Sequence, residues 1–331
     1  AKLYRGVRGA QRAQRCPDVK SDPLLLARFR QLESMGWFRL QRWGLDHFAR
    51  WSSVSDPVHR EKFAEILTIL AWDLWHVRRH HVEFSLQERL SLNTEQARRV
   101  GRNVYKRFFA NSLEMASLPF LTRDRLLQRI EAHGTEHFTE ALARGRGCIV
   151  VSAHYGLWEL VPSWMFHNGW PMTIVVRRQS NPEADAWMEF MRQTHGPKTT
   201  DSGYGLREIL RTLKKGEFLG LMSDQDAGDK GLFVDFLGKK ASTVVGPAQI
   251  AQKTGAPIVT LVLHPQRHRP HQLEIRPPIF PVRFPRGEAG MMAITCAYAD
   301  ILAEWVRARP EQWFWLHRRW KTRPSEEKCL L

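Results

Sequence analysis

The sequence predicts an α/β protein with a mainly parallel central sheet flanked by helices, and with a helical extension at its N-terminus. Two features support this prediction. From residue 148 onward, short apolar runs alternate with stretches of helical length and periodicity, which is typical of parallel sheets. Before residue 148, the segments that can be assigned are all helical in pattern. We therefore expect a functional site where the carboxyl ends of the strands meet.

The N-terminal region is basic and rich in tryptophan. Residues 1–22 hold six Lys or Arg against two Asp, which fits either a disordered tail or a tether to anionic headgroups. Residues 23–60 are expected to be helical and interleave aromatic with basic side chains. This pattern fits a helix lying on a membrane or a helix packed against a core. We expect residues 1–60 to form a membrane-associating extension and residues 61–325 to form the main domain.

Four further helical segments are expected before the sheet begins. The segment 58–80 repeats apolar residues at helical spacing but is too polar to span a bilayer. An amphipathic helix is expected from 93 to 118, with Asn93 or Thr94 as its cap and Pro119 after its end. Shorter helices are expected at 123–131 and 135–144, the second ended by two glycines.

The alternation of strands and helices follows. Four apolar runs predict strands at 148–153, 172–177, 217–222 and 257–263, and 271–276 is expected to be an edge strand. The intervening patterns predict helices at 156–168, 182–194, 203–214 and 245–254, with a last helix at 288–308.

Composition narrows the class of partner. The formal charge of +16 indicates an anionic partner, which can be nucleic acid, anionic lipid or an acidic carrier protein. No recognisable nucleic-acid-binding module is present, so a basic nucleic-acid-binding protein is the weaker hypothesis. The four cysteines include no C-x-x-C pair, so neither a zinc site nor a disulfide framework is indicated. No run of 18 apolar residues predicts a transmembrane helix.

The first candidate for catalysis is a histidine at a strand end. His154 follows the apolar run 148–153, and Glu159 comes five residues later. If His154 lies in the strand-to-helix turn, the Glu159 carboxylate can reach back to one ring nitrogen. The other nitrogen then serves as a general base that activates a hydroxyl. The alternative is a helix-capping histidine beside a solvated glutamate.

The next strand is followed by a candidate anion site. Arg177 stands at the predicted strand end, and Asn181 precedes a helix that begins near Pro182. A guanidinium group and a helix N-terminus both favour phosphate or a developing oxyanion. Two arginines in a solvated loop are the alternative interpretation.

Two carboxylates follow the third strand. Asp224 and Asp226 lie two residues apart and can hydrogen-bond a sugar or an amine, whereas a Mg²⁺ site needs further oxygen ligands from elsewhere. Downstream, residues 233–243 mix apolar with small polar residues. They fit the lining of an acyl channel or a buried loop.

The C-terminal block, Pro310–Lys321, combines three tryptophans with a basic cluster that includes Arg318 and Arg319. These side chains can stack on and clamp an anionic lipid headgroup. They can also stack on nucleic-acid bases. In the third interpretation, the tryptophans pack into the core and the arginines are solvated.

The order of these motifs resembles the bacterial lipid A biosynthesis late acyltransferases, the lauroyl/myristoyl branch of the lysophospholipid acyltransferase superfamily. The motifs are His154-x4-Glu159, Arg177-x3-Asn181-Pro182, Asp224-Gln225-Asp226 and the C-terminal block, and the resemblance covers residues 78–323. The C-terminal block is its most specific part.

The resemblance implies a glycerolipid acyltransferase-like fold and an enzyme at the cytoplasmic face of the bacterial inner membrane. The donor it implies is acyl carrier protein or acyl-CoA, and the acceptor is a hydroxyl or amine of an anionic membrane lipid. By this resemblance His154 is the base, Glu159 holds its tautomer, Arg177 binds phosphate or the oxyanion, and Asp224 and Asp226 position the acceptor. No metal, other cofactor or nucleic acid is required.

Two departures from the family pattern leave the acceptor open. Family members usually have a hydrophobic anchor helix at the N-terminus, whereas this chain has the basic segment 1–60, so peripheral attachment is expected. Arg178 also stands where proline is common. A lipid A precursor is the first candidate acceptor, and an ornithine or other amino lipid, a lysophospholipid or a glycolipid is the alternative.

Overall fold

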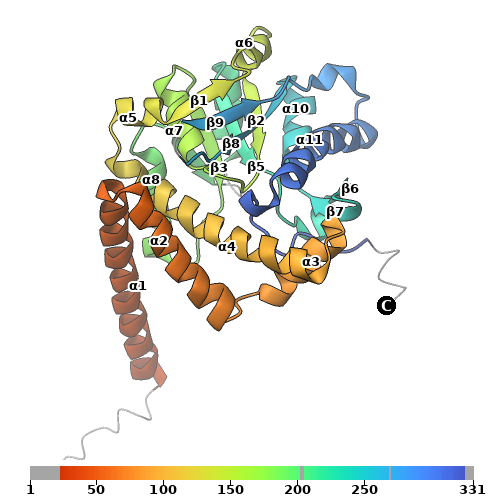
Figure 1. The fold of residues 1–331 in the computed structure, drawn as a ribbon. Coiled ribbons are helices and arrows are strands. Elements are labelled where there is room, and N and C mark those ends of the chain that lie inside the picture. The colour runs from red at the N-terminus through yellow and green to blue at the C-terminus, as the bar shows by residue number, and fades with distance from the viewer. Residues whose placement is uncertain (1–22, 202–204, 268–269, 325–331) are drawn as a thin grey trace, which may run out of the picture.

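The structure is a computed structural model that describes residues 23–201, 205–267 and 270–324 (Figure 1). Its centre is a seven-stranded sheet with the order β1-β9-β8-β2-β5-β3-β4. The strands in chain order are β1 (Ile130–His133), β2 (Cys148–Ser152), β3 (Met172–Val176), β4 (Lys198–Asp201), β5 (Phe218–Met222), β8 (Ile258–His264) and β9 (His271–Ile275). Among the described strands of this sheet, only β8 and β9 pair antiparallel, so the predicted mainly parallel α/β sheet is confirmed.

Two edges of the sheet differ from the prediction. The segment 271–276 does form a strand, but β9 lies inside the sheet, between β1 and β8. The edges are β1, whose first two residues fall in the helix expected at 123–131, and β4, which was not predicted. Both are four residues long. Strand β1 (Ile-Glu-Ala-His) contains only two apolar residues and β4 (Lys-Thr-Thr-Asp) contains none, so both are too short to be predicted from their pattern.

Helices cover both faces of the sheet. In chain order they are α5 (Arg123–Gln128), α6 (Glu136–Leu142), α7 (Leu160–His167), α8 (Pro182–Gln193), α9 (Leu206–Lys214), α10 (Gly246–Thr254) and α11 (Glu288–Ala308). Strand β2 shows the two faces of the sheet: Ile149 and Val151 join one buried cluster, and Cys148 and Val150 join the other. Because side chains of a strand alternate in direction, a run that is apolar at every position is buried on both faces.

The N-terminal helices are grouped on one side of the sheet, below it in the view of Figure 1. They are α1 (Pro23–Val54), α2 (Pro57–Thr68), a π-helix (Ile69–Leu74), α3 (Arg79–Leu90) and α4 (Thr94–Ala116). Helix α4 begins at Asn93, whose side chain accepts a hydrogen bond from the Gln96 amide in a capping box, as the sequence predicted. It contacts α1, α2 and α3.

The boundary expected at residue 60 falls inside α2. The C-terminal half of α1 packs against the main domain: Ala49 is fully buried, and the Ser52 hydroxyl donates a hydrogen bond to the Leu113 carbonyl. The Trp187 indole on α8 also donates to Asp46. The first half of α1 projects beyond the body of the molecule (Figure 1). The expected basic segment 1–22 lies outside the described residues.

One described helix, α11, is long and apolar enough to cross a membrane by length and composition alone. Half of that apolar stretch is buried inside the protein, where it packs against α10 and a hairpin of β6 (Leu232–Phe236) and β7 (Lys239–Thr243). Val234, Phe236 and Ala241 of the hairpin are buried in the same cluster. Residues 233–243 therefore pack as a small sheet against the core, in keeping with the buried alternative and not with a channel lining.

Candidate active site

The pairing of two neighbouring strands brings His154 and Asp224 together. Strands β2 and β5 are parallel neighbours, and their last residues, Ser152 and Met222, lie opposite each other. His154 and Asp224 each follow two residues later on the chain. They therefore leave the same edge of the sheet at the same level, where sites of open α/β sheets are found.

Asp224 binds His154 through both of its oxygens. The His154 Nδ1 atom lies 2.8 Å from Asp224 Oδ1, and the His154 backbone amide donates to Oδ2 at 2.8 Å. The indole Nε1 of Trp313 donates to the same Oδ2 at 2.8 Å. An ionised carboxylate only accepts hydrogen bonds, so it fixes the proton on Nδ1 and leaves the lone pair on Nε2.

The turn that carries His154 depends on one glycine. Gly156 has φ = +57°, and a Cβ atom there would lie 2.0 Å from the Leu263 carbonyl oxygen. Only glycine fits both this left-handed backbone and this contact. The turn is fixed on its other side by the C-terminal block, because the Phe314 amide donates to the His154 carbonyl and the Gly156 amide donates to the Gln312 carbonyl.

The two groups shift each other's pKa in opposite directions. Burial alone would raise the pKa of Asp224, but the charge of His154 and the hydrogen bonds from His154 and Trp313 hold it at about 2. Burial alone would lower the pKa of His154, but the Asp224 charge and hydrogen bond outweigh it and raise the pKa. The pair therefore stabilises an imidazolium, which is what a general base needs after it accepts a proton.

The predicted contact between Glu159 and His154 is not what the structure shows. The Glu159 carboxylate, at the start of α7, forms a two-pronged ion pair with Arg192 of α8, at 2.9 Å from Nε and 2.5 Å from a terminal nitrogen. The carboxylate at the Nδ1 atom of His154 is that of Asp224 and not, as predicted, that of Glu159. Glu159 acts on His154 only through its charge, which helps to raise the pKa of His154.

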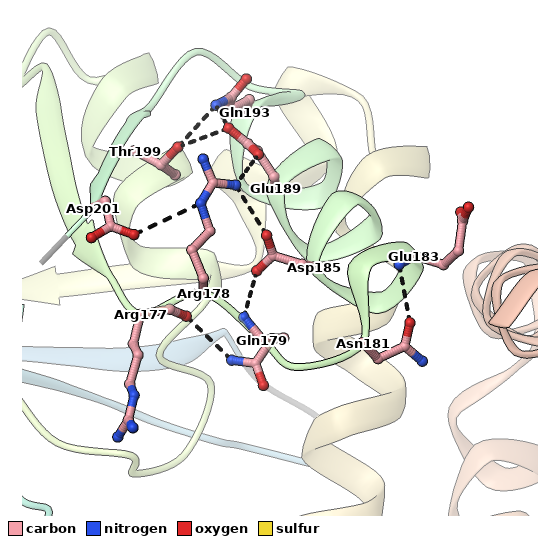
Figure 2. A network of polar contacts seen from close by, with 10 residues as sticks. All are labelled: Arg177, Arg178, Gln179, Asn181, Glu183, Asp185, Glu189, Gln193, Thr199 and Asp201. Atoms are coloured by element: carbon pink, nitrogen blue, oxygen red, sulfur yellow. Dashed lines mark hydrogen bonds and ion pairs between the residues drawn. The ribbon is translucent and has the colours of Figure 1, made fainter. Parts of the chain in front are cut away.

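The residues after β3 divide into two groups, as Figure 2 shows. Arg178 forms ion pairs with Asp185 and Glu189 at 3.0 and 3.1 Å, whereas the exposed Arg177 side chain points away from this network. Asn181 caps α8 by accepting from the amides of residues 183 and 184. Arg177 thus presents a guanidinium at the strand edge without an ion-pair partner among the described residues, while Asn181 is engaged in holding the helix.

The C-terminal block is largely buried. Trp313 and Trp315 are almost fully buried, as is Arg319. The Arg319 guanidinium donates to the carbonyls of Gln225 and Ser242 and to the Thr243 hydroxyl. The predicted contact of Arg319 with a lipid headgroup is therefore wrong, because its buried guanidinium forms hydrogen bonds with groups inside the protein. Of the two adjacent arginines Arg318 and Arg319, Arg318 is the one that is exposed.

Asp226 also serves the C-terminal block. Its carboxylate accepts from the Thr322 hydroxyl at 2.9 Å and from the Thr322 amide at 3.2 Å. Its backbone amide donates to Nε2 of His317 at 2.9 Å. Asp224 and Asp226, two residues apart in sequence, thus hold different elements: the first orients His154, and the second fastens the block that supplies Trp313.

Aromatic side chains surround His154. Trp158 meets the imidazole edge-on with ring centroids 5.4 Å apart, and Phe314 lies at 6.5 Å. Helix α4 contributes Phe108, which packs on Phe314, so that α4 and the C-terminal block close a narrow cleft over His154, lined by aromatic rings and by Asn111, Glu311 and Gln312. With a volume of about 10 Å³ this cleft holds no acyl chain, but its aromatic walls exclude competing water from the base.

Comparison with known proteins agrees with this geometry. The model of the family described as bacterial lipid A biosynthesis acyltransferase matches residues 60–322. This chain belongs to that family. It is similar to the lipid A biosynthesis lauroyltransferase of Escherichia coli (strain K12), with 29% identity over 73% of this chain and 76% of the relative.

Two further relatives show the range of the family. The lipid A biosynthesis palmitoleoyltransferase of Escherichia coli (strain K12) is 28% identical over 75% of this chain and 77% of its own. The phosphatidylinositol mannoside acyltransferase of Mycobacterium tuberculosis (strain CDC 1551 / Oshkosh) is 27% identical over 65% and 68%. The family resemblance predicted from the motifs is confirmed, and the protein is an acyltransferase that transfers an acyl group to a lipid.

For two residues of the site in this family member, the sequence did not predict the role that the structure shows. Arg192 lies in the last turn of the helix predicted at 182–194, and nothing in the sequence indicates that it pairs with Glu159. For Trp313 the sequence predicts stacking on a ligand or packing in the core, whereas in the structure its indole donates a hydrogen bond to Asp224. Within the described ranges, no three His, Cys, Asp or Glu residues gather in a way that suits a metal ion.

Proposed function

We propose that this acyltransferase moves a fatty acyl group from a thioester donor to a hydroxyl or amine of a membrane lipid, with His154 as general base. The observation that carries this proposal is the bond from His154 Nδ1 to the buried Asp224 carboxylate, 2.8 Å long. The bond leaves the lone pair of Nε2 free, and His154 lines a narrow cleft with aromatic walls at the edge of the sheet.

The chemistry needs no covalent acyl-enzyme. His154 Nε2 takes the proton of the acceptor hydroxyl as its oxygen attacks the thioester carbonyl. The tetrahedral intermediate collapses, the carbon–sulfur bond breaks, and the imidazolium returns the proton to the leaving thiolate. Asp224 stabilises the imidazolium between these two steps. We assign the negative charge on the intermediate, or a phosphate of a substrate, to Arg177, whose guanidinium is exposed at the same edge of the sheet.

The substrates are proposed from charge and from the relatives. The net charge of +16 favours an acidic carrier protein as donor, with acyl-CoA as the alternative. A lipid A precursor is the proposed acceptor, since the relatives at 29% and 28% identity are named for lipid A biosynthesis. A glycolipid is the second candidate, because another relative is named a phosphatidylinositol mannoside acyltransferase.

The proposed place of action is the cytoplasmic face of the inner membrane, where the acceptor lies. The projecting half of α1 and the exposed Leu40 and Trp43 further along this helix support contact with a membrane. We propose that residues 1–60 supply part of this attachment, although α1 also packs on the main domain.

The test is acyl transfer by the purified protein from radiolabelled acyl carrier protein and acyl-CoA to a bacterial lipid extract. The matched control is His154→Asn, because the asparagine amide can still donate to Asp224 but cannot act as a base. We expect a new labelled lipid with the wild type, and a loss of at least about a hundredfold with the variant.

Chromatography and mass spectrometry of the labelled lipid identify the acceptor class. A lipid A precursor or a glycolipid as product decides between the two candidates. Equal transfer by wild type and His154→Asn, with both folded, would contradict the role of His154.

A further inference from the structure

A basic pocket lies on the outer side of the C-terminal block. It encloses about 300 Å³ between α3 and the end of the block, at a place where α3 lies beside the β6–β7 hairpin (Figure 1). Its walls include Phe84 and Arg89 of α3 and Arg318, Trp320 and Lys321 of the block. This volume is enough for a headgroup-sized ligand, since ligand pockets begin at roughly 300 Å³.

The charges in this pocket all have one sign. None of the described residues that line it is acidic. Arg318 and Lys321 are exposed, and neither forms an ion pair within the described ranges. The Arg89 guanidinium forms an ion pair with Glu88 at 3.1 Å and lies over the Trp320 ring, 5.5 Å from its centroid.

The pKa of His81, which also lines the pocket, indicates the same positive potential. Burial lowers the pKa of His81, and the charges of Arg318 and Arg78 lower it further against the hydrogen bond to the His317 carbonyl. Arg318 and Lys321, two cations without an ion-pair partner among the described residues, form a site for an anion, and arginine with lysine suits phosphate.

Phe84 of the pocket wall faces solvent, and further exposed apolar side chains lie in the turn that precedes α3. Phe84 is 62% exposed, and the turn before α3 leaves Leu74 and Trp75 exposed at 61% and 70%. Arg78, in this turn, donates to the Leu316 carbonyl at 2.6 Å and so ties the turn to the C-terminal block. Exposed aromatic and aliphatic side chains beside cations are typical of a membrane interface, not of a site for a small free ion.

The pocket also adjoins the loop of the active site. Arg319, which stands between the two exposed cations of the pocket wall, donates to the Gln225 carbonyl at 3.0 Å. The next residue on the other side of Gln225 is Asp224, the partner of His154. The wall of the pocket is therefore connected to the catalytic pair through Arg319 and Gln225.

We propose that this pocket binds the phosphate of a lipid headgroup at the surface of an anionic membrane. The pocket thereby holds the protein on the surface from which its acceptor comes. The role in bringing the protein to its acceptor rests on the proposed acyl transfer to a membrane lipid. The binding of a lipid phosphate in the pocket does not depend on that proposal.

The experiment compares two double variants that each remove two positive charges. Arg318→Gln/Lys321→Gln removes the exposed cations of the pocket, and Lys214→Gln/Lys215→Gln removes two exposed lysines at the end of α9. Binding is measured by co-sedimentation with vesicles of phosphatidylcholine alone and of phosphatidylcholine with phosphatidic acid. We expect about thirtyfold weaker binding of the pocket variant to the anionic vesicles, from roughly fivefold per basic side chain at such a surface. The α9 variant is expected to lose less than about threefold.

Three results would overturn the proposal. Equal losses in the two variants would mean that net charge alone attracts the protein. Unchanged binding by the pocket variant, shown to be folded by thermal unfolding, would exclude the pocket from the membrane contact. If the wild type binds inorganic phosphate in a phosphorus NMR titration, and the pocket variant loses this binding but keeps the vesicles, the ligand is a free ion. A wild type that binds vesicles through the pocket but transfers no acyl group would contradict only the proposed function.

Discussion

At the scale of single residues, the site is a buried carboxylate that gives one histidine its tautomer and its charge. Asp224 accepts three hydrogen bonds, from the His154 ring and backbone amide and from the Trp313 indole. Three donors to one buried carboxylate keep it ionised, and this fixed charge favours the protonated imidazole. The strength of the base is therefore set by Asp224.

The pH dependence of acyl transfer tests this point through Asp224→Asn. The base works only when it is unprotonated, so a raised pKa of His154 places the acidic limb of kcat/KM above the ordinary value of about 6.5. Without the carboxylate charge the pKa of His154 falls, and the limb moves toward lower pH. We also expect a loss of rate of roughly a hundredfold to ten-thousandfold, because an amide can hold the ring in the wrong tautomer. An unmoved limb would argue against Asp224 as the partner of the base.

At the scale of secondary-structure elements, ion pairs and buried polar side chains join segments that carry the site. Glu159 at the start of α7 and Arg192 on α8 connect two helices beside the cleft. Arg319 connects the C-terminal block to the loop after β5 and to β7. Each of these groups is held away from water, so its partner is required for stability.

The Glu159–Arg192 pair is tested by Glu159→Gln. This change leaves a largely buried arginine unpaired, and we expect a loss of about 3 kcal/mol in the free energy of unfolding, measured in urea. The double variant Glu159→Gln/Arg192→Met should recover much of this loss, since neither side chain then carries a charge that needs a partner. The acidic limb of the pH profile should move less than in Asp224→Asn. A shift of equal size would make Glu159 the acid that supports His154.

Two adjacent arginines of the C-terminal block provide a matched comparison. Arg319→Gln removes a buried guanidinium with three acceptors, and we expect a loss of about 3 kcal/mol or more in the free energy of unfolding. Arg318→Gln changes an exposed side chain, so a change within about 0.5 kcal/mol is expected. Urea unfolding of the two variants checks this contrast. Similar values would contradict the assignment of Arg319 to the interior.

At the scale of the whole molecule, the dominant property is a net charge of +16. A field of this sign attracts an acidic carrier protein and an anionic membrane alike, and it acts on the rate of encounter more than on the chemical step. The charge is spread over the chain, so its effect depends on ionic strength and not on any single residue.

The salt dependence of the reaction follows from this charge. With acyl carrier protein as donor, we expect kcat/KM to fall by about tenfold between roughly 0.01 and 0.15 M salt, since the Debye length shrinks from about 30 to about 8 Å. The turnover number kcat should change little. Steady-state kinetics with acyl-CoA, a smaller anion, serve as the comparison and should show a weaker dependence. A flat profile with the carrier protein would rule out electrostatic steering of the donor.

The sequence by itself determined the α/β class, most of the strands and helices, the family and the position of His154 at a strand end. These features are local: apolar periodicity, turn residues and motifs lie within short stretches of chain. The edge strands β1 and β4 were not predicted, because four residues with at most two apolar side chains become a strand only through their neighbours.

Only the tertiary structure decided which carboxylate serves His154. In the sequence Glu159 is five residues away and Asp224 is seventy away, yet the parallel pairing of β2 with β5 brings the distant one to the imidazole. Likewise, packing placed Arg319 in the interior and left its neighbour Arg318 at the surface. Spacing along the chain predicts contacts only within one element. Contacts between elements depend on sheet order and register, which the sequence pattern does not contain.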